Sequence, residues 1–232
     1  LYDVGSTNTL GAATLNGGVL TFGVASTNVG SGTITVKGGA AGALLNIDGV
    51  VNLGMTVNNI AVATAANDRS IVRSTSDLMC YGVRMSEGTV PMSSAFYNDG
   101  GSIRATRLLL GLTAGNSYSY YRHNGGTANL SEFFEIGGYG VGVMDVISGT
   151  IAPYGTAMAT IDRRAGGTGV LNVYGGTVNS PNNGNAFEMS RSDASNPNAL
   201  LNVFGSGVVN AAVGTGTTKI MNLNAGTTDS AL

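Results

Sequence analysis

Apolar and polar residues alternate in many short stretches of this chain. In one of them, Leu171 and Val173 fall on one side of an extended backbone, and Asn172 and Tyr174 fall on the other. A period of two residues is typical of a half-buried β-strand. The glycine pair 175–176 follows directly, and glycine adopts positive φ angles without a Cβ clash. The pattern therefore predicts a short strand that ends in a sharp bend, after which a second strand begins.

The same pattern returns along the chain, which predicts a repeat protein. The stretch 171–179 reappears as 201–210, and the steps between equivalent glycines run from about 19 to about 31 residues, within the range of solenoid repeats. These glycines are Gly101, Gly126, Gly149, Gly176, Gly207 and Gly226. Looser copies occupy 14–20, 34–39, 45–52, 144–151 and 221–227. Such a unit cannot bury its apolar face alone, so neighbouring units must stack.

A third apolar piece completes each unit in the C-terminal half. It is found at 133–136, 157–161 and 186–189, each time before a polar loop. Strand, glycine corner, strand, loop, strand and loop together describe one coil of a β-helix. At about 4.8 Å per coil, we expect one all-β domain over residues 1–232, a parallel β-solenoid of about nine or ten irregular coils. Residues 56–95 break the glycine rhythm and are predicted to be its least regular part, an enlarged loop or an insertion.

The sequences of these units resemble the repeats of a known family. The pattern Phe-Glu-Ile/Met-Gly/Ser followed by Gly-x-Leu-Asn-Val-x-Gly-Gly-Thr-Val-Asn, at residues 133–151, 157–179 and 186–210, is similar to the autotransporter-associated β-strand repeats of large exported bacterial proteins. The resemblance is clearest over residues 130–232 and extends to 10–55. It implies a right-handed parallel β-helix of the pectate-lyase-like type. It does not imply an activity, because this family includes adhesins, stalks and surface proteins without enzymatic chemistry.

Composition and charge exclude several classes of protein. Glycine accounts for 37 of 232 residues and charged residues for 10%, which favours short strands and tight turns over long helices. The formal net charge is −2 and no basic stripe follows the chain, so nucleic acid is not expected as a partner. No apolar run approaches the roughly 18–20 residues of a membrane span.

The first residue bears on localisation. The chain begins with Leu1 and has no charged leader before an apolar stretch. Either a signal peptide has been removed or the sequence is an excised piece of a longer chain. Both readings fit export, so we expect an extracellular or cell-surface protein.

Two residue types that often carry chemistry occur only once. Cys80 is the only cysteine, so no internal disulfide forms, and we expect a buried free thiol; an intermolecular bridge or a reactive nucleophile is the alternative. His123 is the only histidine and precedes a glycine corner, where solenoid side chains tend to face outward. We expect it to be a polar surface residue. One histidine without a cluster of further ligands does not make a metal site, so neither a metal nor a cofactor is predicted.

Carboxylates and arginines of the C-terminal half are the candidates for catalysis, because polysaccharide-degrading enzymes on this fold group acids and bases across adjacent coils. Glu135 and Glu188 hold matching places in their repeats, which puts them on one face. With Ala159 of the intervening coil between them, they would lie about 10 Å apart, two inter-strand steps. That separation indicates a ladder of side chains, so no enzyme activity is predicted. The candidates are Glu135, Asp162, Arg163, Arg164, Glu188, Arg191 and Asp193.

Residues 64–77 concentrate charge, with Asp68, Arg69, Arg73 and Asp77 in one short segment. The segment is predicted to be an enlarged loop or a short helix. Either a solvated loop or a lateral contact with another subunit would explain its charge.

The ends of the predicted solenoid lead to the first functional hypothesis. A terminal coil exposes unpaired N–H and C=O groups above an apolar core unless a cap covers it, and repeat-like sequence begins near Leu1 and continues towards Leu232 without a recognisable cap. Strand addition by the next copy would build a filament. We therefore expect a structural, self-assembling subunit of an extracellular bacterial filament, sheath or surface layer, whose main partner is another copy of itself.

Two alternatives remain open. A carbohydrate-binding adhesin or autotransporter passenger segment would bind extracellular polysaccharide by stacking sugar rings on exposed aromatic side chains. A polysaccharide-degrading enzyme is the least favoured. The aromatic candidates are Tyr118, Tyr120, Tyr121, Tyr139, Tyr154 and Tyr174.

Overall fold

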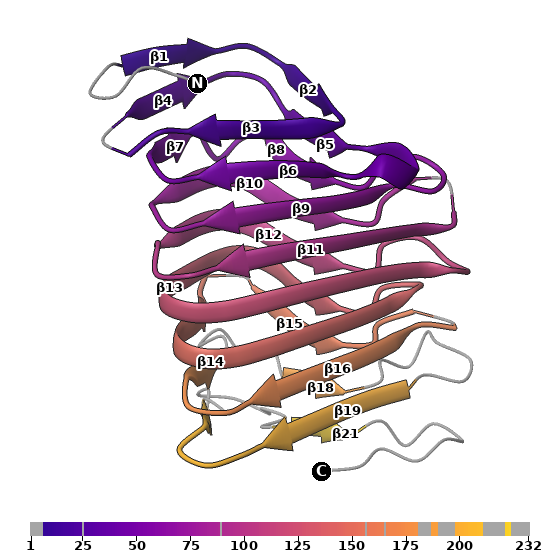
Figure 1. Ribbon diagram of the computed structural model, residues 1–232. Coiled ribbons are helices and arrows are strands. Elements are labelled where there is room, and N and C mark those ends of the chain that lie inside the picture. The colour runs from indigo at the N-terminus through magenta and orange to yellow at the C-terminus, as the bar shows by residue number, and fades with distance from the viewer. Residues whose placement is uncertain are drawn as a thin grey trace.

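The computed structural model describes residues 7–24, 26–88, 90–155, 157–164, 166–180, 187–189, 198–210 and 221–223. These residues are almost entirely β, with parallel strands stacked as a β-solenoid of about seven turns (Figure 1). In Figure 1 the chain crosses the near side from right to left while it descends from the N-terminus, which makes the coil right-handed. The predicted fold class is confirmed. The number of turns is about seven, fewer than the nine or ten coils that the sequence predicted.

Three ladders of parallel strands run along the solenoid axis, and we call them the first, second and third face. The first face consists of β1 (Thr7–Leu10), β4 (Thr27–Gly30), β7 (Val50–Asn52), the beginnings of β10 (Leu78–Met85) and β12 (Ile103–Leu110), the middle of β13 (Ser117–Ile136), the end of β14 (Val141–Pro153), β17 (Thr177–Asn179) and β20 (Val208–Asn210). The second face consists of β2 (Ala13–Asn16), β5 (Ile34–Lys37), β8 (Asn59–Val62), the ends of β10, β12 and β13, β15 (Met158–Ile161), β18 (Phe187–Met189) and β21 (Met221–Leu223).

The third face lies towards the viewer in Figure 1. It consists of β3 (Gly18–Phe22), β6 (Ala43–Ile47), β9 (Arg69–Ser74), β11 (Met92–Asn98), the beginnings of β13 and β14, β16 (Thr168–Val173) and β19 (Asn198–Val203). A short 3-10 helix, η1 (Gly39–Ala41), precedes β6. The length of a coil varies, from 20 residues between the paired Thr7 and Thr27 to 34 between the paired Phe187 and Met221.

The core is filled by side chains that repeat at the same place in successive strands. On the third face, one inward ladder is continuous across seven strands, and each of its members is at most 4% exposed. Burial of one such side chain contributes about 1.5–3 kcal/mol. The members are Leu45, Val72, Phe96, Tyr121, Met144, Leu171 and Leu201. The predicted alternation in β16 is confirmed, since Leu171 is buried and Asn172 is half-buried on the outer side.

Glycines stack at the corner between the third and first faces, as their spacing in the sequence predicted. A Cβ added at Gly101 would lie 1.9 Å from the carbonyl oxygen of Ser76 in the preceding coil. A Cβ added at Gly126 would lie 2.4 Å from the Gly101 oxygen, and a Cβ added at Gly149 would lie 2.5 Å from the Gly126 oxygen. No side chain fits where one backbone passes this closely over the next. Glycine is therefore required here mainly by close approach, in addition to the positive φ angles of Gly126 and Gly149.

Residues 56–95 are as regular as the rest of the described chain, contrary to the prediction. They contain β8, β9, β10 and β11, and each of these strands pairs with strands of the coils before and after it. The charged segment 64–77 is thus neither an enlarged loop nor a helix. Asp68 is buried before β9, and its carboxylate accepts hydrogen bonds from the backbone N–H groups of Gly39, Thr64 and Ala65. This carboxylate orders the corner between the second and third faces. At the corner between the third and first faces, Ser76 stands where the next coil has Gly101, two residues before the paired Leu78 and Ile103, which is why the glycine rhythm is lost there.

Two of the early sequence copies lie on a different face from the one their pattern suggested. Residues 171–173 belong to the third face, whereas Ile34–Lys37 and Ala13–Asn16 pair with each other on the second face. The copy at 45–47 does lie on the third face, in β6. Strands that end at a glycine have similar sequences at every corner of the solenoid. The local pattern therefore does not identify the face on which a strand lies.

Candidate functional site

A groove of about 830 Å³ lies on the outer side of the third face. It crosses β3, β6, β9, β11 and β13, which are consecutive strands of the ladder (Figure 1). Four inter-strand steps separate the first and last of these strands, so the groove runs for about 19 Å along the solenoid axis. Its lining residues are Gly18, Val19, Ala41, Gly42, Ala43, Leu44, Arg69, Ser70, Ile71, Ser93, Ser94, Ala95, Tyr97, Tyr118 and Tyr120.

The floor of the groove is an apolar ladder on the outer side of the sheet. Val19, Leu44, Ile71, Ala95 and Tyr120 are paired in register across five strands. Outer positions of an exposed sheet face are usually polar, yet Val19 is 65% exposed and Ile71 is 39% exposed. Ala95 is small and stands between two larger side chains. The groove therefore has an apolar floor with a low point at Ala95.

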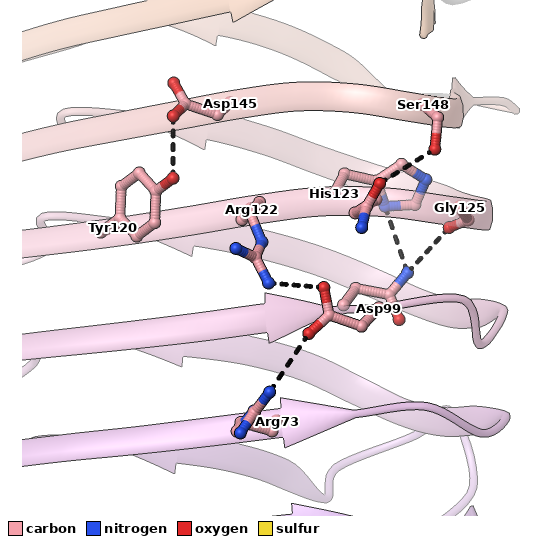
Figure 2. Close-up of polar contacts among 10 residues, drawn as sticks. Arg73, Asp99, Tyr120, Arg122, His123, Gly125, Asp145 and Ser148 are labelled. Atoms are coloured by element: carbon pink, nitrogen blue, oxygen red, sulfur yellow. Dashed lines mark hydrogen bonds and ion pairs between the residues drawn. The ribbon is translucent and has the colours of Figure 1, made fainter.

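Three tyrosines line the part of the groove that β11 and β13 form. Tyr118 is exposed, and the rings of Tyr97 and Tyr120 meet edge to face with their centroids 5.8 Å apart. The hydroxyl of Tyr120 donates a hydrogen bond of 2.8 Å to Oδ2 of Asp145 in the next coil (Figure 2). Burial and this hydrogen bond raise the pKa of Tyr120. Tyr120 is thus a neutral, fixed hydrogen-bonding group beside exposed aromatic surface.

Two arginines extend the groove through a second, adjoining hollow of about 410 Å³. Arg73 and Arg122 line it, together with Leu44, Ile71 and Tyr97, and the last three also line the larger groove. The guanidinium of Arg122 lies over the ring of Tyr97 at 4.8 Å.

A single carboxylate stands between these arginines (Figure 2). Nη2 of Arg122 donates to Oδ1 of Asp99 at 2.7 Å, and Nη2 of Arg73 lies 3.8 Å from Oδ2 of Asp99. The side chain of Asp99 is 17% exposed, that of Arg122 33% and that of Arg73 57%. Arg122 is therefore held in place by two partners, whereas Arg73 is the more loosely held cation.

A row of polar side chains continues from the groove along the same face. Asp145 accepts a hydrogen bond from Asn172 at 2.8 Å, and Asn172 in turn accepts one from Asn202 at 2.8 Å. These residues occupy the same register position as Arg122. The outer side of the third face thus carries hydrogen-bonding groups well beyond the groove.

His123 is buried, so the prediction of a polar surface residue is wrong. Its Nδ1 lies 3.2 Å from Nδ2 of Asn98 and 3.3 Å from the hydroxyl of Tyr121, and its Nε2 lies 3.3 Å from the Gly126 oxygen. Burial lowers the pKa of His123 to about 4. The corner turns the strand so that this position faces inward, under Asn98 of the preceding coil. Tyr121 is also buried, contrary to its listing among exposed aromatics, and packs against Phe96 with ring centroids 5.6 Å apart.

Four of the seven candidates for catalysis fall into one cluster on the second face. Glu135 is buried, and Arg163 and Arg164 contact its carboxylate at 3.2 and 3.6 Å. Asp162 is buried beside them, and burial raises the pKa of its carboxyl to about 7. None of these four residues lines either of the two hollows described above. The arrangement is that of an ion-paired structural carboxylate.

Glu135 and Glu188 do share a ladder two strands apart, as predicted. The residue between them is Thr160, not Ala159, because Ala159 pairs with Phe134 and Phe187 one position earlier. The prediction was one residue out of register. Arg191 and Asp193 lie outside the described residues.

The remaining predicted candidates are scattered. Cys80 is a buried free thiol, as expected, and burial raises its pKa to about 12. Tyr139, Tyr154 and Tyr174 are exposed, each away from the groove. In the part of the chain that the structure describes, no group of three or more His, Cys, Asp or Glu side chains converges on a common point, and no helix has the length and apolar character to cross a membrane.

Sequence reasoning missed the groove, although it singled out Tyr118 and Tyr120. Ala95, Arg122 and Asp99 were not recognised as belonging with them. One signal was available: Leu44-Leu45 and Ile71-Val72 place apolar residues on both sides of their strands. Only the register between coils shows that these outer apolar residues are neighbours.

Comparison of this chain with models of known protein families, with curated proteins and with solved structures found no match.

Proposed function

We propose that this protein is a non-enzymatic β-solenoid of the bacterial cell surface that binds an extended carbohydrate in the groove of its third face. The observation that carries the proposal is the combination of an apolar floor with exposed tyrosine rings and hydrogen-bonding groups in one open groove. A sugar ring presents an apolar C–H face and a polar edge, so it needs both kinds of contact at once. Specific sites combine apolar surface with a few fixed polar groups in this way.

The shape of the groove favours a chain of several sugars over a single compact molecule. It is open, and it follows the axis for about 19 Å across five strands. Ser93 and Arg69 lie along it at paired positions in β11 and β9, with Tyr118 beside them in β13. A side chain that can donate a hydrogen bond therefore stands at this position in three successive coils, which suits a polymer.

Affinity electrophoresis against a panel of soluble bacterial, plant and algal polysaccharides tests this proposal. We expect retardation by at least one of them, and a loss of about fivefold in affinity in Tyr118→Ala, since one aromatic stacking contact is worth about 1 kcal/mol. Tyr154→Ala is the matched control, because Tyr154 is similarly exposed but lies outside the groove. Absence of retardation by every polysaccharide, or an equal loss in both variants, would contradict the proposal.

A second candidate is the head-to-tail structural filament. Among the described residues, β1, β2 and β3 each have a paired strand on one side, formed by β4, β5 and β6. Backbone groups on the other side are the kind that accept an added strand from another copy. Electron microscopy of the purified protein at high concentration tests it: unbranched fibres support assembly, and dispersed single particles at every concentration contradict it.

A further inference from the structure

We infer that the carbohydrate bound in the groove is anionic, and that its acidic substituents are recognised by Arg73 and Arg122, with Arg69 as a further cation at the other edge. The inference rests on the proposed function, because it names the class of carbohydrate that the same groove takes. Carboxylated, sulfated and phosphorylated sugars share the chemistry in question, a negatively charged oxygen group beside a sugar ring.

Charge in the groove is opposite to charge in the chain as a whole. The linings of the two adjoining hollows include three arginines, Arg69, Arg73 and Arg122, and no carboxylate. The whole chain has 11 basic and 13 acidic residues and a net charge of −2. A concentration of cations in the groove of an acidic protein favours an anionic ligand at that place and disfavours one elsewhere.

Asp99 indicates where a ligand anion would sit. Its carboxylate is shared by Arg122 and Arg73, and it engages Nη2 of each guanidinium. A guanidinium has five N–H donors, so each arginine retains donors that Asp99 does not use. Asp99 thereby aligns the two cations without neutralising both. Asp145, beside Arg122 in the next coil, accepts hydrogen bonds from Tyr120 and Asn172.

Arg122 and Arg73 differ in how firmly they are placed. Arg122 is stacked on Tyr97 and bonded to Asp99 at 2.7 Å, so its position is set before a ligand arrives. Arg73 is 57% exposed and lies 3.8 Å from Asp99, beyond hydrogen-bonding distance. We expect Arg122 to orient the anionic group and Arg73 to close on it. Preorganisation of one of two donors lowers the entropic cost of binding.

The ring and the charge of one sugar residue are matched by neighbouring features of the groove. Tyr97 lines both hollows, between the apolar floor at Ile71 and the guanidinium of Arg122. A sugar ring on the tyrosine side would carry its acidic group towards the arginines. A long apolar ligand would leave the arginines unused, and a short free anion would leave the tyrosines unused.

The experiment compares oligosaccharides that differ only in charge. The probes are glucan, galactan and mannan oligomers, each in a neutral, a C6-carboxylated and a 6-sulfated form, and binding is measured by calorimetry at low and high salt. We expect the charged forms to bind about tenfold tighter than the neutral form of the same backbone, since a charge-assisted hydrogen bond is worth about 1.5–3 kcal/mol. The difference between carboxylated and sulfated forms identifies which anion is preferred.

Variants assign the effect to the arginines. In Arg73→Gln the charged forms should bind no better than the neutral form, and Arg73→Lys should restore part of the preference. Arg104→Gln is the matched control, because Arg104 is an exposed arginine of the first face. Circular dichroism and thermal unfolding establish that the variants are folded; Arg73 is the exposed member of the pair, so its replacement preserves the packing of Arg122 on Tyr97.

The outcomes separate the inference from the proposed function. Equal binding of neutral and charged forms overturns the anionic preference and leaves carbohydrate binding in place. No binding of any oligomer overturns both. Tighter binding of poly-glutamate than of every charged oligosaccharide would mean that the groove takes an acidic polypeptide, and would overturn both as well.

Discussion

Asn98 and His123 occupy the same position on consecutive coils, and Nδ2 of Asn98 lies 3.2 Å from Nδ1 of His123. Nδ2 of Asn98 also donates to the backbone oxygens of Gly101 and Gly125 at 2.8 and 3.2 Å (Figure 2 shows the contacts to His123 and Gly125). The two N–H groups of the amide are shared among the two carbonyl oxygens and Nδ1 of His123. Burial lowers the pKa of His123, which keeps the imidazole neutral, and its Nε2 lies 3.3 Å from the Gly126 oxygen.

Neutral His123 makes stability depend on pH. Its pKa in the folded protein is about 4, against 6.5 for an ordinary histidine, so between these values the unfolded chain binds a proton that the folded chain does not. The contribution of His123 is complete above pH 6.5 and is lost as the pH falls to 4, by about 3 kcal/mol in total. In His123→Asn, which extends the Asn98 ladder, the contribution of His123 should be absent, so the difference in stability between wild type and variant should change by about 3 kcal/mol between pH 6.5 and pH 4. Urea unfolding at pH steps of half a unit measures it, and parallel curves for the two proteins would contradict the assignment.

Asp162 produces the opposite slope over nearly the same range. Burial raises the pKa of its carboxyl from 3.8 to about 7, so here the folded chain keeps a proton that the unfolded chain loses. Stability from this group is present below pH 3.8 and is lost as the pH rises to 7, by about 4 kcal/mol. Asp162→Asn should gain stability relative to the wild type across this range, since asparagine tolerates the φ of 54° found there.

Opposed slopes predict a flat profile for the wild type between pH 4 and 6.5. The double variant of His123 and Asp162 should also be nearly flat, while each single variant slopes in its own direction. A single variant with the slope of the wild type would mean that its group does not titrate as described.

The glycine stack predicts a large cost for adding one methyl group. Gly101→Ala places a Cβ 1.9 Å from the Ser76 oxygen, and the backbone of two coils must separate to accept it. We expect a loss of about 3 kcal/mol or more in the free energy of unfolding, measured with urea. Gly11→Ala is the control, because a Cβ at Gly11 meets nothing within 4 Å and its φ is ordinary; this change should be neutral within about 0.5 kcal/mol. Equal effects of the two changes would contradict the stacked corner.

The buried ion pair of Glu135 should contribute more to the free energy of unfolding than a surface ion pair does. Glu135→Gln leaves Arg163 and Arg164, which are 20% and 35% exposed, without their counter-charge. Since both arginines retain access to water, we expect a loss of about 2 kcal/mol, below the full cost of breaking a deeply buried pair. Glu132→Gln removes the exposed partner of Arg107 and should cost less than about 1 kcal/mol. Thermal unfolding of both variants gives the comparison, and a smaller loss for Glu135→Gln than for Glu132→Gln would refute it.

The thiol of Cys80 should be unreactive in the folded protein. Its side chain is fully buried and burial raises the pKa of the thiol to about 12, so thiolate is scarce at pH 8. Ellman's reagent should react with less than a tenth of the thiol in native protein and with all of it in guanidinium chloride. Rapid reaction under native conditions would place Cys80 at an accessible site.

Local pattern was enough for the repeating unit and insufficient for its position in the coil. The alternation around Leu171 predicted an inward and an outward side, and the paired registers with Met144 and Leu201 agree with it. The same reasoning put 34–37 on the wrong face, because every strand that ends at a corner has a similar sequence. It also missed β9, since Ser76 stands at the corner after this strand, where the next coil has Gly101.

The candidate site was less accessible to sequence reasoning than the fold. Tyr118 and Tyr120 were identified by residue type alone, which also led to Tyr121, a core residue. The groove depends on a small side chain, Ala95, being placed between Ile71 and Tyr120 by pairing across some 25 residues of sequence. The sequence of one strand does not determine which side chains lie next to it in the following coil.

The sequence by itself determined that the chain is a stack of short parallel strands, because the two-residue period and the recurring glycines are local properties of each unit. Tertiary structure alone decided which outward side chains become neighbours, and with them the groove, the Arg73–Asp99–Arg122 group and the burial of His123. The physical reason is that side-chain contacts on a solenoid run between coils, at right angles to the chain. Their register is set by the length of each intervening loop and by the packing of the core, which no single repeat contains.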